Sequence, residues 1–374
     1  MNATRPCIGI SAIGIYEPSR KLTNQWFGSS ISRKFVHHTG TESRLLSSHD
    51  EVAMGVRAVE KLRQETQCDL RDCAAVVFVS PSFIPTTMAR KFLSPELQRR
   101  ERLSLAANRL ASELGIENRP LYGINWFCSG YSKALSLVQR QVVPALSNHQ
   151  QGLQQQQFVL VVTAGRISRI TDYDCSQTAP LFGDMATATL ISRLDSRKYP
   201  VHFKVTHAFA EKQPAPGVFF NFELRQNVLM PGDDDSRAQA NERLVFSLDG
   251  LGIADVAPRA MANAVAKSLQ ARRLRAADVR FVVPHQAGTG IVRLASMKLE
   301  QLGVQGEVVN GITGQVGNVS SSSIPFALKQ TWQKLEGLIA CPTAAVGAPG
   351  VAEVSQGCIL LEAVGNGPGV ARAA

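Results

Sequence analysis

The fold is indicated most clearly by the stretch Gly123-Ile-Asn-Trp-Phe-Cys-Ser-Gly-Tyr-Ser-Lys-Ala-Leu135. A largely apolar run from Leu121 to Phe127 ends at Cys128, and the residues after Ser129 have the apolar spacing of a helix. At a junction between a strand and a helix, backbone NH groups and the positive end of the helix dipole lower the pKa of a thiol. The stretch therefore predicts a strand, a turn and a helix, with Cys128 as an activated nucleophile.

Cysteines are also common in protein cores, so this stretch alone fits a structural cysteine as well. Two later stretches favour catalysis: Val282-Val-Pro-His-Gln-Ala-Gly-Thr-Gly290 and Gly317-Asn-Val-Ser-Ser-Ser-Ser-Ile-Pro325. Each leads from an apolar or glycine-rich turn into a helical pattern, which places His285 and Asn318 on the same kind of loop as Cys128. We expect the thiol, the imidazole and the carboxamide to converge.

Five short motifs follow one another along most of the chain. They are Cys-Ser-Gly-Tyr-Ser-Lys-Ala-Leu at 128–135, Leu-Phe-Gly-Asp at 181–184, Pro-His-Gln-Ala at 284–287, Gly-Asn-Val-Ser-Ser-Ser-Ser-Ile-Pro at 317–325 and Leu-Leu-Glu-Ala-Val-Gly-Asn-Gly at 360–367. In these motifs and their order the chain resembles the β-ketoacyl-acyl carrier protein synthase III family of thiolase-like condensing enzymes. Each motif alone is a weak signal, but their combination is specific.

Strands and helices alternate in both parts of the chain, which favours an α/β layered sheet protein. The resemblance sharpens this expectation to the five-layered αβαβα thiolase fold with two pseudo-repeated halves, in a homodimer. The halves are expected at residues 1–195, with Cys128, and at residues 196–374, with His285 and Asn318. Strands are predicted at 8–15, 74–79, 158–163, 185–191, 279–283 and 358–361, and helices at 51–62, 103–114, 256–274, 290–302 and 324–335.

Three connections join these elements. The connection over residues 81–115 is longer than the family usually has, and it could cap an acyl pocket, line a subunit interface or form a surface insertion. The glutamine-rich tract at 150–157 reads as a surface loop. Residues 214–237, rich in Pro, Gly and Asp, are predicted to form an extended connection between the halves.

The resemblance implies a decarboxylative Claisen condensation. Cys128 takes the starter acyl group as a thioester, and His285 and Asn318 donate hydrogen bonds to the extender's thioester carbonyl as malonyl decarboxylates. The backbone NH groups of Cys128 and Asn366 are expected to form an oxyanion hole. The substrates are acyl and malonyl thioesters of coenzyme A or acyl carrier protein, and neither a permanently bound cofactor nor a metal is expected. Asp184 reads as a structural hydrogen-bonding residue.

The chain departs from the family at the coenzyme A entrance. The family usually carries a Trp and an Arg where this chain reads Lys34-Phe-Val-His-His-Thr-Gly40, with His38 at the Arg position, and Gly288 replaces an Asn. These changes favour a starter delivered by a carrier protein. Together with the long connection, they favour a specialised role in fatty acid or polyketide-type biosynthesis, including secondary metabolism. Initiation of fatty acid synthesis, and an acyltransferase of the same fold that forms esters or amides, are the alternatives.

Composition restricts the partners. The chain has 374 residues, 44% of them hydrophobic, and neither a run of about 18 apolar residues nor a signal peptide, so we expect a cytoplasmic protein without membrane partners. A net charge of +10 favours acidic partners such as an acyl carrier protein, and no nucleic-acid-binding motif is present. The seven scattered cysteines lack a CxxC pair, which argues against zinc and disulfides.

Two other classes of protein remain open. A cysteine hydrolase would also carry Cys, His and Asn in this order, but the papain-like word Cys-Gly-Ser-Cys-Trp is absent. A non-catalytic partner subunit is disfavoured, because all three polar residues are retained. Arg293 and Lys298 either dock a carrier protein or are ordinary surface charges. The remaining histidines read as structural or surface residues: His37, His38, His49, His149, His202 and His207.

Overall fold

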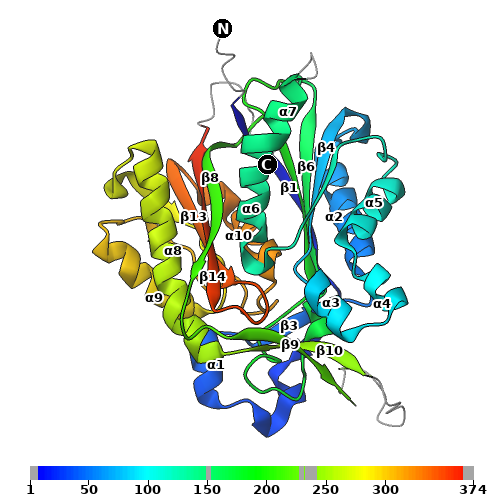
Figure 1. Cartoon of the computed structure of the whole chain (residues 1–374). Helices are drawn as coiled ribbons and strands as arrows, with labels where there is room; N and C mark the ends of the chain where they lie inside the picture. Colours follow the sequence, from blue (N-terminus) through cyan, green and yellow to red (C-terminus); the bar gives the residue numbers. More distant parts are fainter. Residues whose placement is uncertain (1–6, 149–152, 227–230, 232–241, 365–374) are drawn as a thin grey trace.

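The computed structural model describes residues 7–148, 153–226, 231 and 242–364. Its framework is one ten-stranded mixed sheet made of two five-stranded parts, which meet where β1 pairs briefly with β8 (Figure 1) and are called here the first and the second sheet. In the first sheet the strand order is β5 (Leu121–Ile124), β4 (Cys73–Val79), β6 (Phe158–Gly165), β7 (Met185–Arg193) and β1 (Ile8–Tyr16). In the second it is β12 (Glu307–Val308), β11 (Val279–Val282), β13 (Leu338–Val346), β14 (Glu353–Ala363) and β8 (Phe203–Pro214).

The two sheets repeat one topology. In each, the first three strands run parallel and the fourth is antiparallel to both of its neighbours. The first sheet is built from residues 8–193 and the second from residues 203–363. This confirms the predicted pseudo-repeat.

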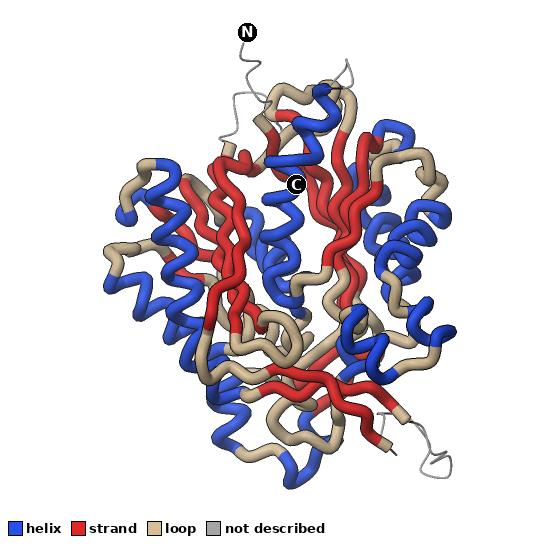
Figure 2. The backbone as a smooth tube through the Cα atoms, viewed as in Figure 1, coloured by secondary structure: helices blue, strands red, loops and turns tan. Residues whose placement is uncertain are grey.

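Helices lie between the sheets and on both outer faces (Figures 1 and 2). The inner layer consists of α6 (Gly130–Leu137) and α10 (Ser323–Thr331), whose apolar residues join strands of both sheets in one core. The first sheet is covered by α2 (Glu51–Thr66) and α5 (Leu103–Glu113), and the second by α8 (Gly250–Arg272) and α9 (Thr289–Gln301). The predicted αβαβα layering is therefore confirmed.

Burial explains why these sequences form these elements. All seven residues of β4 are buried, because helices cover both faces of the sheet, and the strand is accordingly a continuous apolar run. The outer helix α2 is amphipathic instead, and its first turn is capped by Asp50, whose carboxylate accepts a hydrogen bond from the Ala53 NH at 2.9 Å. After α6 the chain passes through a π-helical turn into α7 (Val143–Asn148).

Short helices and strands cover the end of the sheets that lies next to the cavity described below. They are the pair β2 (Arg20–Thr23) and β3 (Ser43–Leu46), α1 (Arg33–Thr39), α3 (Thr86–Phe92), α4 (Pro95–Arg100), and the pair β9 (Phe220–Arg225) and β10 (Arg243–Leu248). The long connection at 81–115 contains α3 and α4 before α5. One prediction is wrong here, because residues 214–237 are not simply an extended connection but contain the strand β9; residues 227–230 and 232–237 lie outside the described ones.

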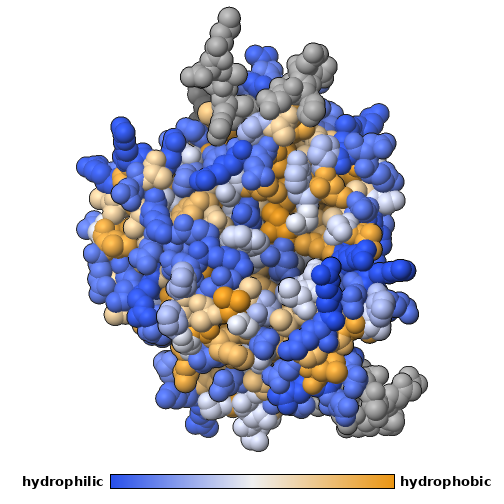
Figure 3. Space-filling view, viewed as in Figure 1, coloured by the Kyte–Doolittle hydropathy of each residue, from blue (hydrophilic) through white to orange (hydrophobic). Residues whose placement is uncertain are grey.

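The surface bears on the predicted partners. Within the described residues, no helix combines the length and the apolar character needed to cross a bilayer. Figure 3 shows apolar atoms gathered over β9 and the loop after β13, where Phe219 and Val351 are 53% and 48% exposed. All seven cysteines are described and free, and no group of three or more potential metal ligands occurs in this part of the chain.

Candidate active site

Cys128, His285 and Asn318 line one cavity of about 780 Å³. Each follows a strand and precedes a helix: Cys128 lies between β5 and α6, His285 between β11 and α9, and Asn318 between β12 and α10. The first and the last of these junctions are equivalent in the two repeated sheets. The pseudo-repeat thus brings three residues that are far apart in sequence to the same end of the molecule.

The turn that carries Cys128 is tightly constrained. Phe127 has a left-handed backbone (φ 42°), a conformation that costs a bulky residue free energy and that clusters at functional sites. Gly130 begins α6 so close to β4 that an added Cβ would lie 2.6 Å from a methyl carbon of Val79. The thiol is therefore held by a turn with little freedom to move.

The expectation of a lowered thiol pKa at Cys128 is wrong for this structure. Burial raises the pKa of the Cys128 thiol to about 11, and hydrogen bonds from the Ser320 hydroxyl and the cysteine's own backbone NH offset only part of this. A helix dipole contributes about 0.3–1 kcal/mol, less than one pKa unit, whereas burial shifts pKa values by up to about 3–5 units. Burial is the larger effect, and Cys128 rests as a thiol.

Ser320 joins two of the three residues, a role that was not predicted from the sequence. Its hydroxyl donates to the Cys128 sulfur at 3.4 Å, and its backbone NH donates to the Asn318 side-chain oxygen at 2.9 Å. Its backbone is left-handed (φ 51°), which only the three-dimensional turn reveals. Ser320 therefore positions both the thiol and the carboxamide.

We expect Ser320→Gly to slow alkylation of Cys128 by iodoacetamide about three- to tenfold near pH 8.5, because one hydrogen bond to the thiolate is lost. Glycine accommodates the left-handed backbone, so the turn itself should persist. In the wild type the rate should rise about tenfold per pH unit up to about pH 11, as the raised pKa requires. Mass spectrometry of the Cys128 peptide separates it from the other thiols.

Ser321→Ala is the matched control for Ser320→Gly, since the Ser321 hydroxyl is buried and has no hydrogen-bond partner within the described residues. Equal alkylation rates in Ser320→Gly and the wild type across this pH range would show that the hydroxyl does not act on the thiol.

His285 is a neutral imidazole at physiological pH. Its side chain is 1% exposed, and burial lowers its pKa to about 4. Nδ1 has no hydrogen-bond partner within the described residues, so no carboxylate stabilises the charged form. The backbone NH donates to the Pro342 carbonyl at 2.9 Å, which ties the loop to β13. A neutral imidazole can donate one hydrogen bond into the cavity without carrying a charge.

The amide group of Asn318 has a defined orientation. The atom that accepts from the Ser320 NH must be the oxygen, because a backbone NH only donates. The NH₂ group is then left to donate into the cavity. The Asn318 backbone is fixed as well: its NH donates to the Leu181 carbonyl at 2.7 Å, and its carbonyl accepts from the Gly183 NH at 3.1 Å.

Asp184 supports the site from behind. Its carboxylate accepts hydrogen bonds from the Ser47 NH and from the Ser168 hydroxyl and NH, at 2.6–2.9 Å, which join the strands and turns around the cavity. Burial raises the pKa of Asp184 to about 6. It is not among the residues that line the cavity, which agrees with a structural role.

Asn366 lies outside the described residues. The last described residue is Val364, whose NH donates to the His202 carbonyl. Val364 follows β14, a strand of 11 residues that extends over roughly 35 Å from Glu353. The turn that adjoins the cavity follows β13, whose last residues Ala344 to Val346 line it.

The cavity opens to the surface at a mouth between α1 and the starts of α8 and α9, where lining residues such as Leu251 and Leu294 are exposed. Lys34 and His38 of α1 are exposed and also line the cavity. Glycine at positions 288 and 290 has a steric reason: a Cβ at Gly290 would lie 2.6 Å from the His38 carbonyl oxygen, and one at Gly288 would lie 3.3 Å from the Thr39 carbonyl oxygen. These glycines let α1 close directly on α9.

The remaining basic residues and histidines considered in the sequence analysis do not line the cavity, as far as the structure describes them. Arg293 and Lys298 are exposed on α9 and do not line the cavity. His149 lies outside the described residues. The remaining predicted structural or surface histidines are absent from the cavity lining: His37, His49, His202 and His207.

Known protein families match both parts of the chain. Residues 122–207 match the family model described as 3-oxoacyl-acyl carrier protein synthase III, and residues 269–347 match the model of the C-terminal part of the same enzymes. The β-ketoacyl-acyl carrier protein synthase III of Helicobacter pylori (strain HPAG1) is 25% identical over 330 residues, which cover 87% of this chain and 89% of that protein.

Solved structures of the same kind share the fold. The 3-oxoacyl-acyl carrier protein synthase III of Pseudomonas aeruginosa PAO1 superposes with a TM-score of 0.68 at 19% identity, over 97% of this chain and 100% of that one. The priming β-ketosynthase of the R1128 polyketide biosynthetic pathway does so with a TM-score of 0.64 at 22% identity, over 96% and 97%.

Proposed function

Because this chain belongs to the β-ketoacyl-acyl carrier protein synthase III family of condensing enzymes, we propose that it joins a starter acyl group on Cys128 to a malonyl extender. One observation carries this proposal: a thiol, a neutral imidazole and the NH₂ group of a carboxamide line a single, mainly apolar cavity. The reaction needs one nucleophile to hold an acyl group and two donors to stabilise an enolate.

In the first half-reaction, the Cys128 sulfur attacks the thioester carbonyl of the starter and the carrier thiol leaves. Only a small fraction of Cys128 is ionised at neutral pH, but a thiolate of high pKa is intrinsically the stronger nucleophile. The Ser320 hydroxyl and the NH groups at the start of α6 stabilise the thiolate as it forms.

In the second half-reaction, the malonyl thioester carbonyl accepts hydrogen bonds from His285 and from the Asn318 NH₂ group. These donors stabilise the enolate that forms as carbon dioxide leaves. The enolate carbon attacks the acyl carbonyl on Cys128, the carbon–sulfur bond breaks, and the β-ketoacyl product remains on the extender's carrier. The apolar walls keep water from the acyl-enzyme and so disfavour hydrolysis.

We propose that the starter is delivered by an acyl carrier protein. Coenzyme A presents several phosphates and an adenine at the mouth of such a cavity, whereas a carrier protein presents a single phosphate on its pantetheine arm. Among the described lining residues, Lys34 is a cation at the mouth and no arginine is present. The chain's charge of +10 suits an acidic carrier.

We also propose that the chain forms a homodimer and acts in a specialised pathway. Among the described strands β5 pairs with β4 alone, so a second copy of the chain can extend the sheet along this edge and form a homodimer. The extra helices α3 and α4, the changed mouth and the likeness to a polyketide priming ketosynthase support a role in specialised fatty acid or polyketide-type biosynthesis.

Radiolabelled acyl loading tests the proposed function. We expect purified protein to bind an acyl group covalently at Cys128 and to pass it to malonyl-acyl carrier protein with release of carbon dioxide. A cysteine hydrolase would instead release the free acid, and a non-catalytic partner subunit would bind no label. Supplying the same acyl group on coenzyme A and on a carrier protein identifies the preferred donor.

A further inference from the structure

The inner part of the cavity is built for an acyl chain much larger than acetyl. Its walls are aromatic and aliphatic and include Phe127, Ile167, Ile170, Phe220 and Phe246. If the pantetheine arm fills half of the 780 Å³, roughly 390 Å³ remains. At the roughly 30 Å³ that one water-sized group occupies in a liquid, this space holds about thirteen such groups, which is enough for an acyl chain of about eight to twelve carbons. An acetyl group would leave most of this space empty.

Behind this wall lies α3, the helix within the long connection. Met88, Ala89 and Phe92 of α3 pack in one apolar cluster with Ile167, Ile170, Phe220 and Phe246, but none of the three lines the cavity. In Figure 1, α3 lies on the β10 side of the molecule and α1 lies on the other side of β9. Helix α3 therefore supports from behind the apolar residues that form this wall of the cavity.

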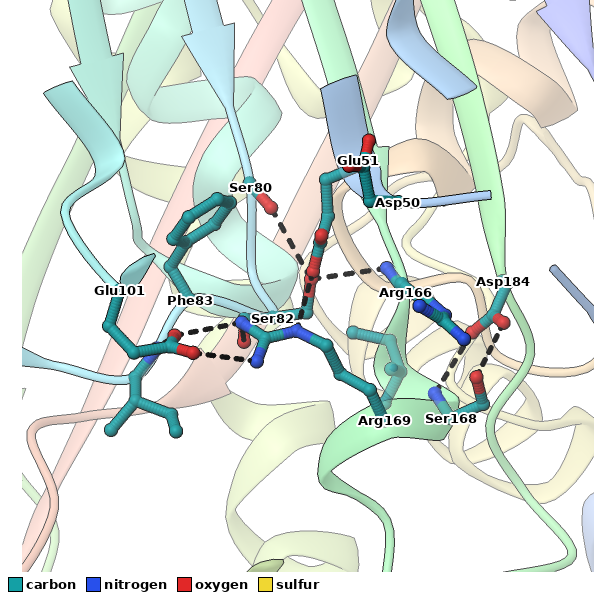
Figure 4. A network of polar contacts seen from close by, with 12 residues as sticks. Asp50, Glu51, Ser80, Ser82, Phe83, Glu101, Arg166, Ser168, Arg169 and Asp184 are labelled. Carbon is teal, nitrogen blue, oxygen red and sulfur yellow. Dashed lines mark hydrogen bonds and ion pairs between the residues drawn. The ribbon is translucent and has the colours of Figure 1, made fainter. Parts of the chain in front are cut away.

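The segment that carries α3 is anchored by three charged residues, Arg169, Glu101 and Glu51, which we call the latch (Figure 4). The Arg169 guanidinium donates to both oxygens of Glu101 at 2.8 Å and to Glu51 at 2.7 Å. The same Glu101 carboxylate accepts from the Ile84 NH at 2.8 Å. One carboxylate thus ties together the beginning and the end of the segment 84–101.

The latch connects this segment to the cavity wall. Arg169 belongs to the short helical turn Ile167–Ile170, whose two isoleucines line the cavity. The side chains of Arg169, Glu101 and Glu51 are only 22%, 11% and 7% exposed, so their attraction is weakly screened by solvent. By contrast, no residue of α4 is buried, and in α3 only Ala89 is. The latch and the apolar cluster together hold α3 in place.

We propose that the starter is a medium-length acyl chain of about eight to twelve carbons, and that α3, held by the latch, is the end wall that limits its length. This inference rests on the proposed function, because it concerns the acyl group that Cys128 accepts. It assigns a role to the long connection, and it makes Phe92 and Glu101 specificity-determining residues although neither touches the reacting atoms.

The test is competitive loading of Cys128 from an equimolar mixture of acetyl, octanoyl, decanoyl, dodecanoyl and palmitoyl thioesters, read by mass spectrometry of the Cys128 peptide. We expect octanoyl to dodecanoyl groups to exceed acetyl about tenfold. Phe92→Ala should raise the ratio of palmitoyl to octanoyl about tenfold, because room for each further methylene favours binding about fourfold. Arg90→Ala, an exposed change on the same helix, should leave the ratio unchanged.

Glu101→Gln tests the latch separately, with Glu96→Gln on the exposed face of α4 as its control. We expect Glu101→Gln also to raise the share of palmitoyl, since α3 loses its charged anchor. If Phe92→Ala does not fold, Met88→Ala carries the same test, because Met88 belongs to the same cluster.

Three results are decisive. Preferred loading of acetyl by the wild type would overturn the proposed chain length. A preference for medium chains that folded Phe92→Ala and Glu101→Gln both leave unchanged would overturn the role of α3. No loading of any acyl group would instead overturn the proposed function itself.

Discussion

Cys128→Ala should abolish condensation while malonyl decarboxylation continues. Loss of the nucleophile removes the covalent acyl-enzyme, and we expect the rate of β-ketoacyl formation to fall on the order of 10⁴-fold or more. His285 and Asn318 retain their positions, because Cys128 contributes neither of the hydrogen bonds that fix the Asn318 side chain and the His285 backbone. Release of carbon dioxide from malonyl-acyl carrier protein should therefore stay within about tenfold of the wild-type rate.

The measurement follows labelled carbon dioxide and the β-ketoacyl product in the same reaction. Cys175→Ala is the matched control, since Cys175 is also a free, half-buried cysteine but does not line the cavity. If Cys128→Ala still condensed acyl groups, or if carbon dioxide release ceased together with condensation, the division of labour between the thiol and the two donors would be wrong.

The three site residues could be predicted because each lies in the same kind of local sequence pattern. Cys128, His285 and Asn318 each follow an apolar or glycine-rich stretch and precede a helical pattern, and these patterns are set by neighbouring residues. The fold was predictable for the same reason, because fully covered strands such as β4 must be apolar throughout. That the three residues share one cavity follows from the repeated topology, which neighbouring residues do not encode.

The structural features that could not be predicted from the sequence depend on contacts between residues that are far apart in the chain. The Pro- and Gly-rich residues around β9 predict an extended connection, whereas pairing with β10 makes this segment a strand. The raised pKa of Cys128 results from burial, which outweighs the local effect of the helix start. Ser320 meets the thiol across 192 positions of sequence, and Arg169 meets Glu101 across 68. No local pattern marks such pairs.

Asn318→Asp should nearly eliminate decarboxylation without unfolding the site. Aspartate keeps an oxygen that accepts from the Ser320 NH, so the turn retains its hydrogen bond. The second oxygen replaces the NH₂ donor and, when ionised, places negative charge next to the developing enolate. Loss of one such donor costs about 10²–10³-fold in rate, and the added repulsion should bring the loss to the upper end of that range or beyond.

Release of labelled carbon dioxide from malonyl-acyl carrier protein measures this loss, with Asn310→Asp as an exposed amide control. Acyl loading of Cys128 should survive in Asn318→Asp, since the first half-reaction does not use the carboxamide. The pH profile adds a second criterion: burial lowers the pKa of His285 to about 4, so its imidazole stays neutral down to that pH. Protonation of His285 should therefore not reduce wild-type decarboxylation between about pH 5.5 and 7.5. Unchanged carbon dioxide release in Asn318→Asp would show that the enolate is stabilised by other groups, because the only donor that the Asn318 side chain can offer to the cavity has then been removed.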